Sequence, residues 1–170
     1  AVTVLYMGYR YGWEELAVGL VPAAVGVCSM IVQGGLIRPV VKRIGERRAL
    51  GAGLAFGAAG LAIYGLAPTG AIFLAGIPVM ALWGLAGPSA QSLMSRRVDP
   101  SEQGQLQGAT SSLQAITGMI GPTLFTQVFA QSIATGEGPH VPGMAFLVAA
   151  AMLVVAGGIA WLVTRERAAP

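Results

Sequence analysis

The sequence predicts an all-α integral membrane protein. Of its 170 residues, 55% are hydrophobic and only 10% are charged, and the mean hydropathy is +0.70. Soluble domains carry about 25% charged residues, so seven acids and ten bases are too few to form the polar surface of a soluble domain this long. The 25 glycines agree with this class, because small residues allow membrane helices to pack closely.

Five apolar stretches have the length of a membrane span, which is about 20 helical residues. The first covers residues 15–37 and ends where five of the ten bases crowd into residues 38–48. The second covers residues 49–67 and ends at an uncharged Pro-Thr-Gly turn. The third covers residues 71–94, contains two prolines, and ends before a pair of arginines.

The last two spans begin after turn signals. Residues 105–130 follow an acid at the N-cap position (Asp99), a proline at the first helical position (Pro100) and an acid three residues after the cap (Glu102), which together resemble a capping box. Residues 141–164 follow a polar turn with two prolines and contain no strongly polar side chain. We expect this span and residues 49–67 to face lipid.

The bases predict the orientation of these spans. Nine of the ten lie at one end of the five stretches, and the positive-inside rule makes that end cytoplasmic. They are Arg38, Lys42, Arg43, Arg47, Arg48, Arg96, Arg97, Arg165 and Arg167. Five spans that end in the cytoplasm must begin outside, so we expect a preceding helix, and more besides, to be missing from this fragment.

Charge and residue types argue against other classes of function. The bases lie at span ends, where they report topology rather than nucleic-acid binding. All seven acids also lie at span ends or in loops. The one histidine, His140, has no nucleophilic partner at membrane depth, and the one cysteine, Cys28, cannot form a thiolate metal site. We therefore expect neither an enzyme nor a bound cofactor or metal.

Uncharged polar side chains form a stripe along residues 105–130. Gln107, Ser111, Gln114 and Gly118 advance by four, three and four positions, flanked by Thr110, Thr117 and Gly121. That spacing places them on one face of a helix, where they either bind another helix or line an aqueous cavity. With polar and aromatic residues of the first and third spans, the candidates for a cavity lining are Gln33, Trp83, Gln91, Ser111, Gln114 and Thr117.

Two glycine pairs have the spacing of close helix crossings. Gly53 and Gly57 form one GxxxG pair, and Gly104 and Gly108 form the other.

Three segments carry a resemblance to a known family. "YRYGW", "GLIRPVVKRIGERRAL" and "GLAGPSAQSLMSRRVDPSEQGQLQGATSSLQAITGMIGPTLF" resemble the C-terminal half of a major facilitator superfamily transporter of the tetracycline–proton antiporter-like branch. The resemblance implies a twelve-helix fold in two halves, of which this chain supplies the last five helices and the end of the seventh. It also implies export of a small molecule, such as a drug, by alternating access, driven by the proton gradient.

The resemblance also assigns roles to particular residues. Drug-resistance members carry a histidine and an aspartate where this chain has Ser29 and Gly57, so the substrate is left open between tetracycline and another small molecule. The basic stretch resembles the family's cytoplasmic gating loop; plain topology is the alternative reading. Its candidate residues are Arg38, Lys42, Arg43, Gly45, Arg47 and Arg48.

The expected location is the bacterial inner membrane, with a cytoplasmic C-terminus. The expected partners are the lipid bilayer, the N-terminal transporter half and the small-molecule substrate, and no nucleic acid. The alternative from another class is a non-transporting helical scaffold or a truncated product, whose polar faces would be buried against other helices. A channel is disfavoured because the sequence shows no ring of charges or carbonyl filter.

Overall fold

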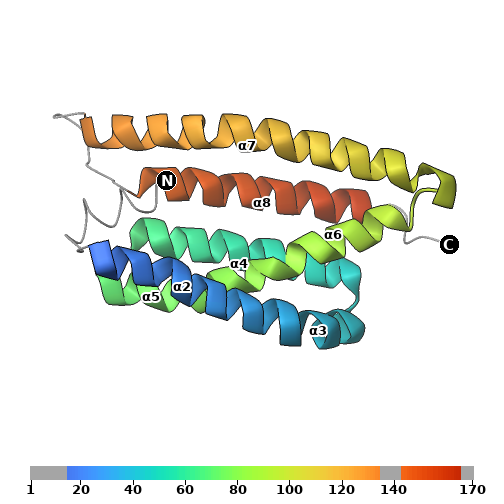
Figure 1. Ribbon diagram of the computed structural model, residues 1–170, viewed down its shortest axis with the longest axis horizontal. Coiled ribbons are helices and arrows are strands. Elements are labelled where there is room, and N and C mark those ends of the chain that lie inside the picture. Colours follow the sequence, from blue (N-terminus) through green and yellow to red (C-terminus); the bar gives the residue numbers. More distant parts are fainter. Residues whose placement is uncertain (1–14, 135–142, 166–170) are drawn as a thin grey trace.

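The computed structural model describes residues 15–134 and 143–165, and every regular element in them is a helix (Figure 1). The elements are α2 (Glu15–Ile31), η1 (Val32–Leu36), α3 (Ile37–Ile44), α4 (Glu46–Leu66), α5 (Gly70–Ala81), η2 (Leu82–Leu85), α6 (Ala86–Ser95), η3 (Pro100–Glu102), α7 (Gln103–Ala134) and α8 (Met144–Arg165).

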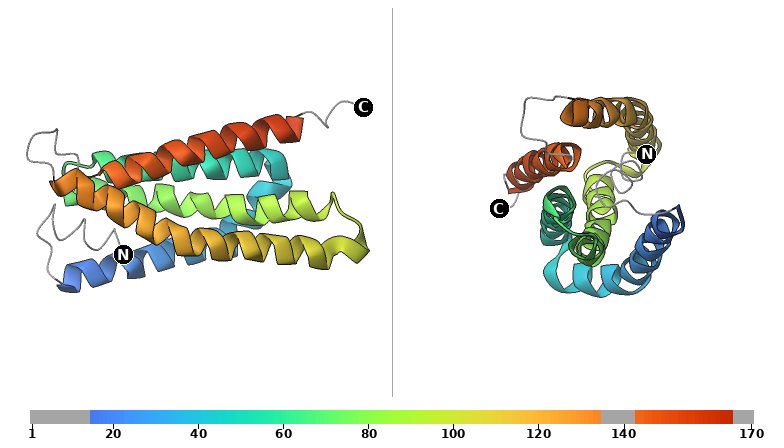
Figure 2. Two further views of the ribbon diagram at one scale, coloured as in Figure 1. Left: turned by 90° about the horizontal axis from the view of Figure 1, so that it is seen from above. Right: turned by 90° about the vertical axis from the view of Figure 1, so that its left-hand side faces the viewer.

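These elements form long rods that run side by side. α2, η1 and α3 follow one another without a break, as do α5, η2 and α6. Seen end-on in Figure 2, α4 and α8 lie on one side of the bundle, α5 and α6 lie in the middle, and α2 lies on the other side. α7 lies along one margin, where it packs against α8 and the end of α6.

Four of the rods are long and apolar enough to cross a membrane. They are residues Gly19–Ile44, Glu46–Leu66, Gly70–Ser95 and Met144–Thr164, and they confirm the predicted class of fold. The fifth predicted span is the 32-residue helix α7, which is long enough but more polar, because the predicted stripe of amides and hydroxyls runs along it.

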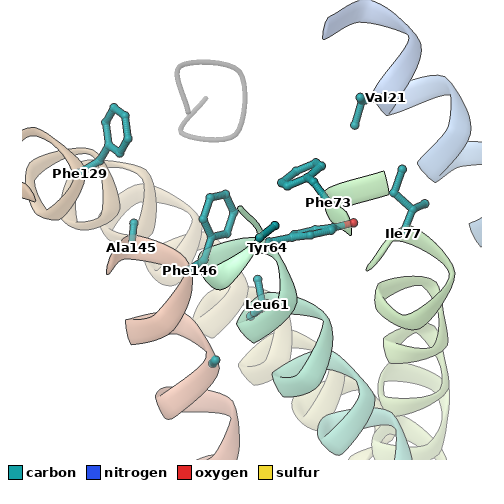
Figure 3. Close-up of a cluster of buried hydrophobic side chains, with 10 residues drawn as sticks. Val21, Leu61, Tyr64, Phe73, Ile77, Phe129, Ala145 and Phe146 are labelled. Atoms are coloured by element: carbon teal, nitrogen blue, oxygen red, sulfur yellow. The ribbon is translucent and has the colours of Figure 1, made fainter. Parts of the chain in front are cut away.

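Aromatic rings join α4, α5 and α8 at one end of the bundle (Figure 3). The ring of Tyr64 stacks on Phe73 with centroids 4.2 Å apart and meets Phe146 edge-on at 6.0 Å. Offset stacking and edge contacts are the favourable geometries for aromatic pairs. Close by, Gly65 of α4 meets the backbone of Gly143, so α4 and α8 touch at this end.

The first glycine pair marks a close crossing, and the second does not. A Cβ atom on Gly53 would lie 2.6 Å from the backbone nitrogen of Ala86, and one on Gly57 would lie 2.8 Å from Cγ of Trp83. Nothing described lies within 4 Å of a Cβ on Gly104 or Gly108. These contacts bury part of α4, which is the most buried of the four apolar rods, so only the rest of its surface is left to face lipid.

Helix boundaries differ from the sequence prediction at the two turns that follow the first and third rods. The predicted loop 38–48 is mostly helix: α3 continues to Ile44, and Gly45, with φ of +81°, is a one-residue corner before α4. Glycine adopts such a positive φ without steric cost. At the other turn Asp99 makes no side-chain cap; Pro100 instead opens the short helix η3, closed by a backbone hydrogen bond from Glu102 to Asp99.

Candidate functional site

Two irregular helical segments meet about midway along their rods. η1 is a π-helical turn with the sequence VQGGL, and η2 is a 3-10 turn with the sequence LWGL. A Cβ atom on Gly84 of η2 would lie 3.7 Å from Cγ of Gln33 in η1, so the two segments are in contact. Such turns within longer helices often mark hinges.

A proline follows each irregular segment at a fixed distance. Pro39 comes four residues after Gly35 of η1, and Pro88 comes four residues after Gly84 of η2. A proline in a helix donates no backbone hydrogen bond, and its ring clashes with the carbonyl four residues earlier. The wider π turn and the tighter 3-10 turn are therefore local responses to proline at these positions.

The contact between η1 and η2 holds two of the six cavity candidates. Gln33 has an exposed side chain, and Trp83 is 38% exposed. One part of the Trp83 ring fills the space left by the absent side chain of Gly57 on α4, beside Leu153 of α8. The rest of the ring is available to a ligand.

The other candidates lie on α6 and α7. Gln91 of α6 donates a hydrogen bond of 2.8 Å from Nε2 to Oε1 of Gln107, which connects one end of the polar stripe to the third rod. Ser111 and Gln114 are exposed, and Thr117 is exposed with its hydroxyl donating to the backbone oxygen of Leu113 at 2.9 Å.

Both sides of α7 are open over its middle third. Every residue from 111 to 120 is exposed, including apolar ones such as Leu113 at 65% and Met119 at 76%. The described residues therefore pack against neither the polar nor the apolar side of α7 over this stretch. The structure does not bring the stripe against Gln33 or Trp83.

The predicted gating stretch takes part in a network at the end of the bundle that carries the basic residues, through partners that the sequence did not indicate. Glu46 accepts a hydrogen bond of 2.6 Å from Ser92 Oγ and pairs with Arg96 at 2.8 Å between Oε1 and Nη2. Glu46 is in the first turn of α4, where a negative charge is favourable. These contacts join the start of α4 to the end of α6.

Arg47 makes a second connection, from α4 to α8. Its Nε donates to Thr164 Oγ1 at 3.1 Å, and its guanidinium carbon lies 4.5 Å from the centre of the Trp161 ring. Cations over a tryptophan face are attracted by the ring quadrupole. A residue of the basic stretch thus fixes the position of the last helix.

A small pocket of about 310 Å³ lies between α3, the start of α4 and α6. Arg38 and Lys42 line it, together with Glu46, and so does Ser89, which is only 1% exposed. The Ser89 hydroxyl has no hydrogen-bond partner among the described residues. Within residues 15–134 and 143–165 no group of His, Cys, Asp and Glu side chains has the arrangement of a metal site.

The sequence matches a known family over its whole length. The family profile described as Major Facilitator Superfamily matches residues 1–170. The chain belongs to the Major Facilitator Superfamily. Membership makes it part of a family of multi-pass membrane transporters, which agrees with its apolar helical rods.

Curated relatives narrow the resemblance within this superfamily. The tetracycline resistance protein of class C from Escherichia coli is 32% identical over 155 residues, which is 91% of this chain and 38% of that protein. The class G protein from Vibrio anguillarum is 31% identical over 138 residues, covering 81% of this chain and 35% of that protein. The chain therefore spans little more than a third of the length of these relatives. No solved structure matches it.

Proposed function

We propose that this superfamily chain is the C-terminal part of an exporter in the bacterial inner membrane, with its C-terminus in the cytoplasm. The exporter moves a small molecule by alternating access, in exchange for protons. Support comes from superfamily membership and from the relatives named as tetracycline resistance proteins. The basic residues at one end of the rods support the orientation.

The contact between η1 and η2 is the observation that carries the proposal. Transporters bind their substrates near the middle of the membrane, at sites that interrupted helices typically form. Both segments interrupt regular helix in the interior of a membrane rod, and both carry a candidate for substrate contact, Gln33 and Trp83. The amide would hydrogen-bond the substrate and the indole would stack on an aromatic group.

The proposal places proton coupling in the N-terminal half. Acids in the described rods lie only near their ends, as Glu46 does at the start of α4. Ser29 and Gly57 stand where drug-resistance members have ionisable residues, so the substrate need not be tetracycline. The Glu46 network would act as a latch that holds the cytoplasmic ends of α4 and α6 together in one access state.

Cysteine labelling of the full-length protein tests this function. In a Cys28→Ser background we expect Ser111→Cys and Gln114→Cys to react with a membrane-impermeant maleimide, because the polar side of α7 would line an aqueous cavity. Leu113→Cys, on the apolar side of the same helix, is the matched control and should remain unreactive. Addition of a transported compound should slow the reaction at Ser111→Cys and Gln114→Cys.

Transport into everted membrane vesicles tests the driving force. A proton gradient, acid inside, should drive uptake of the compound, and collapse of the gradient should stop it. If Ser111→Cys and Gln114→Cys are as inert as Leu113→Cys in the full-length protein, the polar side of α7 is buried against another helix. The scaffold alternative would then hold, and the exporter would be excluded.

A further inference from the structure

A groove of about 620 Å³ runs between α4 and α8, apart from the six cavity candidates. It shares with the basic stretch and its contacts only Arg48 and Trp161, the ring that Arg47 covers. Small residues hollow out its walls, among them Gly51 and Ala55 on α4 and Gly157 on α8. The other lining residues are aliphatic, except for Arg48 and Trp161 at one end. The two helices that line the groove, α4 and α8, lie on the side of the bundle away from α2 (Figure 2).

The length of the groove matches one leaflet of a bilayer. Its lining on α4 extends from Arg48 to Ala58, a rise of about 15 Å at 1.5 Å per residue. That is about half of the 30 Å hydrocarbon core. Beyond it the two helices close, with Gly65 of α4 against the backbone of Gly143. A groove of this length suits one acyl chain of a single leaflet, which ends near the bilayer midplane.

The polar end of the groove is suited to an anionic headgroup. Arg48 is exposed there, and the lining includes no acidic side chain. Trp161 is 48% exposed, and tryptophan favours the level of the lipid headgroups. The neighbouring Arg47 is held by Thr164 and Trp161, so a second positive charge lies close to the headgroup level. Basic pockets between membrane helices on the cytoplasmic side bind anionic lipids.

We propose that this groove binds an anionic phospholipid of the cytoplasmic leaflet. The Arg48 guanidinium donates hydrogen bonds to the phosphate, in the two-pronged geometry that arginine favours, and one acyl chain lies along the glycines and alanines between α4 and α8. The site is independent of the transported molecule.

Fluorescence of Trp161 tests the site in the full-length protein. The protein is placed in nanodiscs that contain increasing fractions of phosphatidylglycerol or phosphatidylcholine, each with brominated acyl chains that quench tryptophan. The difference between wild type and Trp161→Phe gives the signal of Trp161. One arginine at an anionic lipid strengthens binding about fivefold, so half-maximal quenching should need about fivefold less phosphatidylglycerol than phosphatidylcholine.

Three variants separate the parts of the proposal. Arg48→Gln should remove the preference for phosphatidylglycerol, while Arg97→Gln, an equal loss of charge on the same side but outside the groove, should keep it. Gly51→Leu fills the groove, has space for its Cβ, and should reduce quenching by both lipids. Equal quenching by the two lipids in wild type, an equal effect of Arg97→Gln, or undiminished quenching in Gly51→Leu would overturn the site.

Discussion

At the scale of single residues, glycine decides how closely α4 crosses α5 and α6. The atoms nearest to a Cβ on Gly53 are backbone atoms of Ala86, which cannot rotate away. On Gly57 they belong to the Trp83 ring and to Leu153 of α8, so both neighbouring rods meet this position. A methyl group at either position must therefore push two rods apart.

We predict that Gly53→Ala and Gly57→Ala destabilise the full-length protein. Overpacking costs about 1–3 kcal/mol, whereas alanine regains only about 1 kcal/mol of helix propensity over glycine. Gly108→Ala is the control, because its Cβ meets nothing within 4 Å and it gains the same propensity. Thermal unfolding in detergent should show lower midpoints for the first two variants only; three equal shifts would show that the close crossing is unimportant.

The burial of the groups around Glu46 predicts which of its two partners, Ser92 or Arg96, contributes more to stability. Arg96 has a side chain 72% exposed, and ion pairs with so exposed a partner contribute about 0–1 kcal/mol. The hydrogen bond from Ser92 reaches a carboxylate whose side chain is only 16% exposed, and bonds to charged groups contribute about 1.5–3 kcal/mol. Ser92→Ala should therefore lower the unfolding midpoint more than Arg96→Gln does. If Arg96→Gln lowers the unfolding midpoint more than Ser92→Ala does, the ion pair is the contact that holds α4 and α6 together.

At the scale of elements, the two interrupted rods have the same arrangement of an irregular turn followed by a proline. Each has a π or 3-10 turn that ends shortly before a proline, and these turns touch each other. Proline alone is not sufficient, since Pro78 and Pro122 lie within helices of regular α type. The interruptions are therefore specific to the level at which Gln33 and Trp83 lie.

We predict that Pro39→Ala and Pro88→Ala stabilise the folded protein but slow its transport of substrate. Alanine restores the hydrogen bond to the carbonyl four residues earlier and removes a clash that costs about 3 kcal/mol in a helix interior, so the rods lose their preferred bend. Transport into vesicles should fall severalfold while the amount of protein in the membrane is unchanged. Pro78→Ala serves as the control, and an equal loss of transport there would mean that bending at η1 and η2 has no special role.

Some of these elements could be predicted from the sequence, and others could not. The spacing of an amphipathic helix is present at Ile37, Val40, Val41 and Ile44. A helix could therefore be predicted here in place of the expected loop. The contact of Arg47 with Thr164 joins positions 117 residues apart. Such contacts depend on how two rods rotate against each other, which periodicity within one rod does not determine.

At the scale of the whole molecule, the number of rods that cross the membrane rests on α7. The four apolar rods are predicted directly by hydropathy, because lipid selects long runs of apolar residues. The stripe on α7 lowers its hydropathy, and its polar side would be stable in a membrane only beside an aqueous cavity or another helix. The four apolar rods make an odd number of crossings only if α7 crosses as well. A chain that begins outside would then end in the cytoplasm.

We predict that α7 crosses the membrane completely. Its 32 residues span about 48 Å, more than the bilayer core requires. α7 extends along the long axis of the bundle, as α8 does in Figure 1, and packs against it. In the Cys28→Ser background, Ser101→Cys should react with an impermeant maleimide only from the cytoplasmic side, and Ala130→Cys only from the outside. Both residues are exposed, so packing among the described residues will not hide either of them. Reaction of both from one side would leave four crossings, place both ends of the chain in one compartment, and remove the aqueous cavity from the polar side of α7.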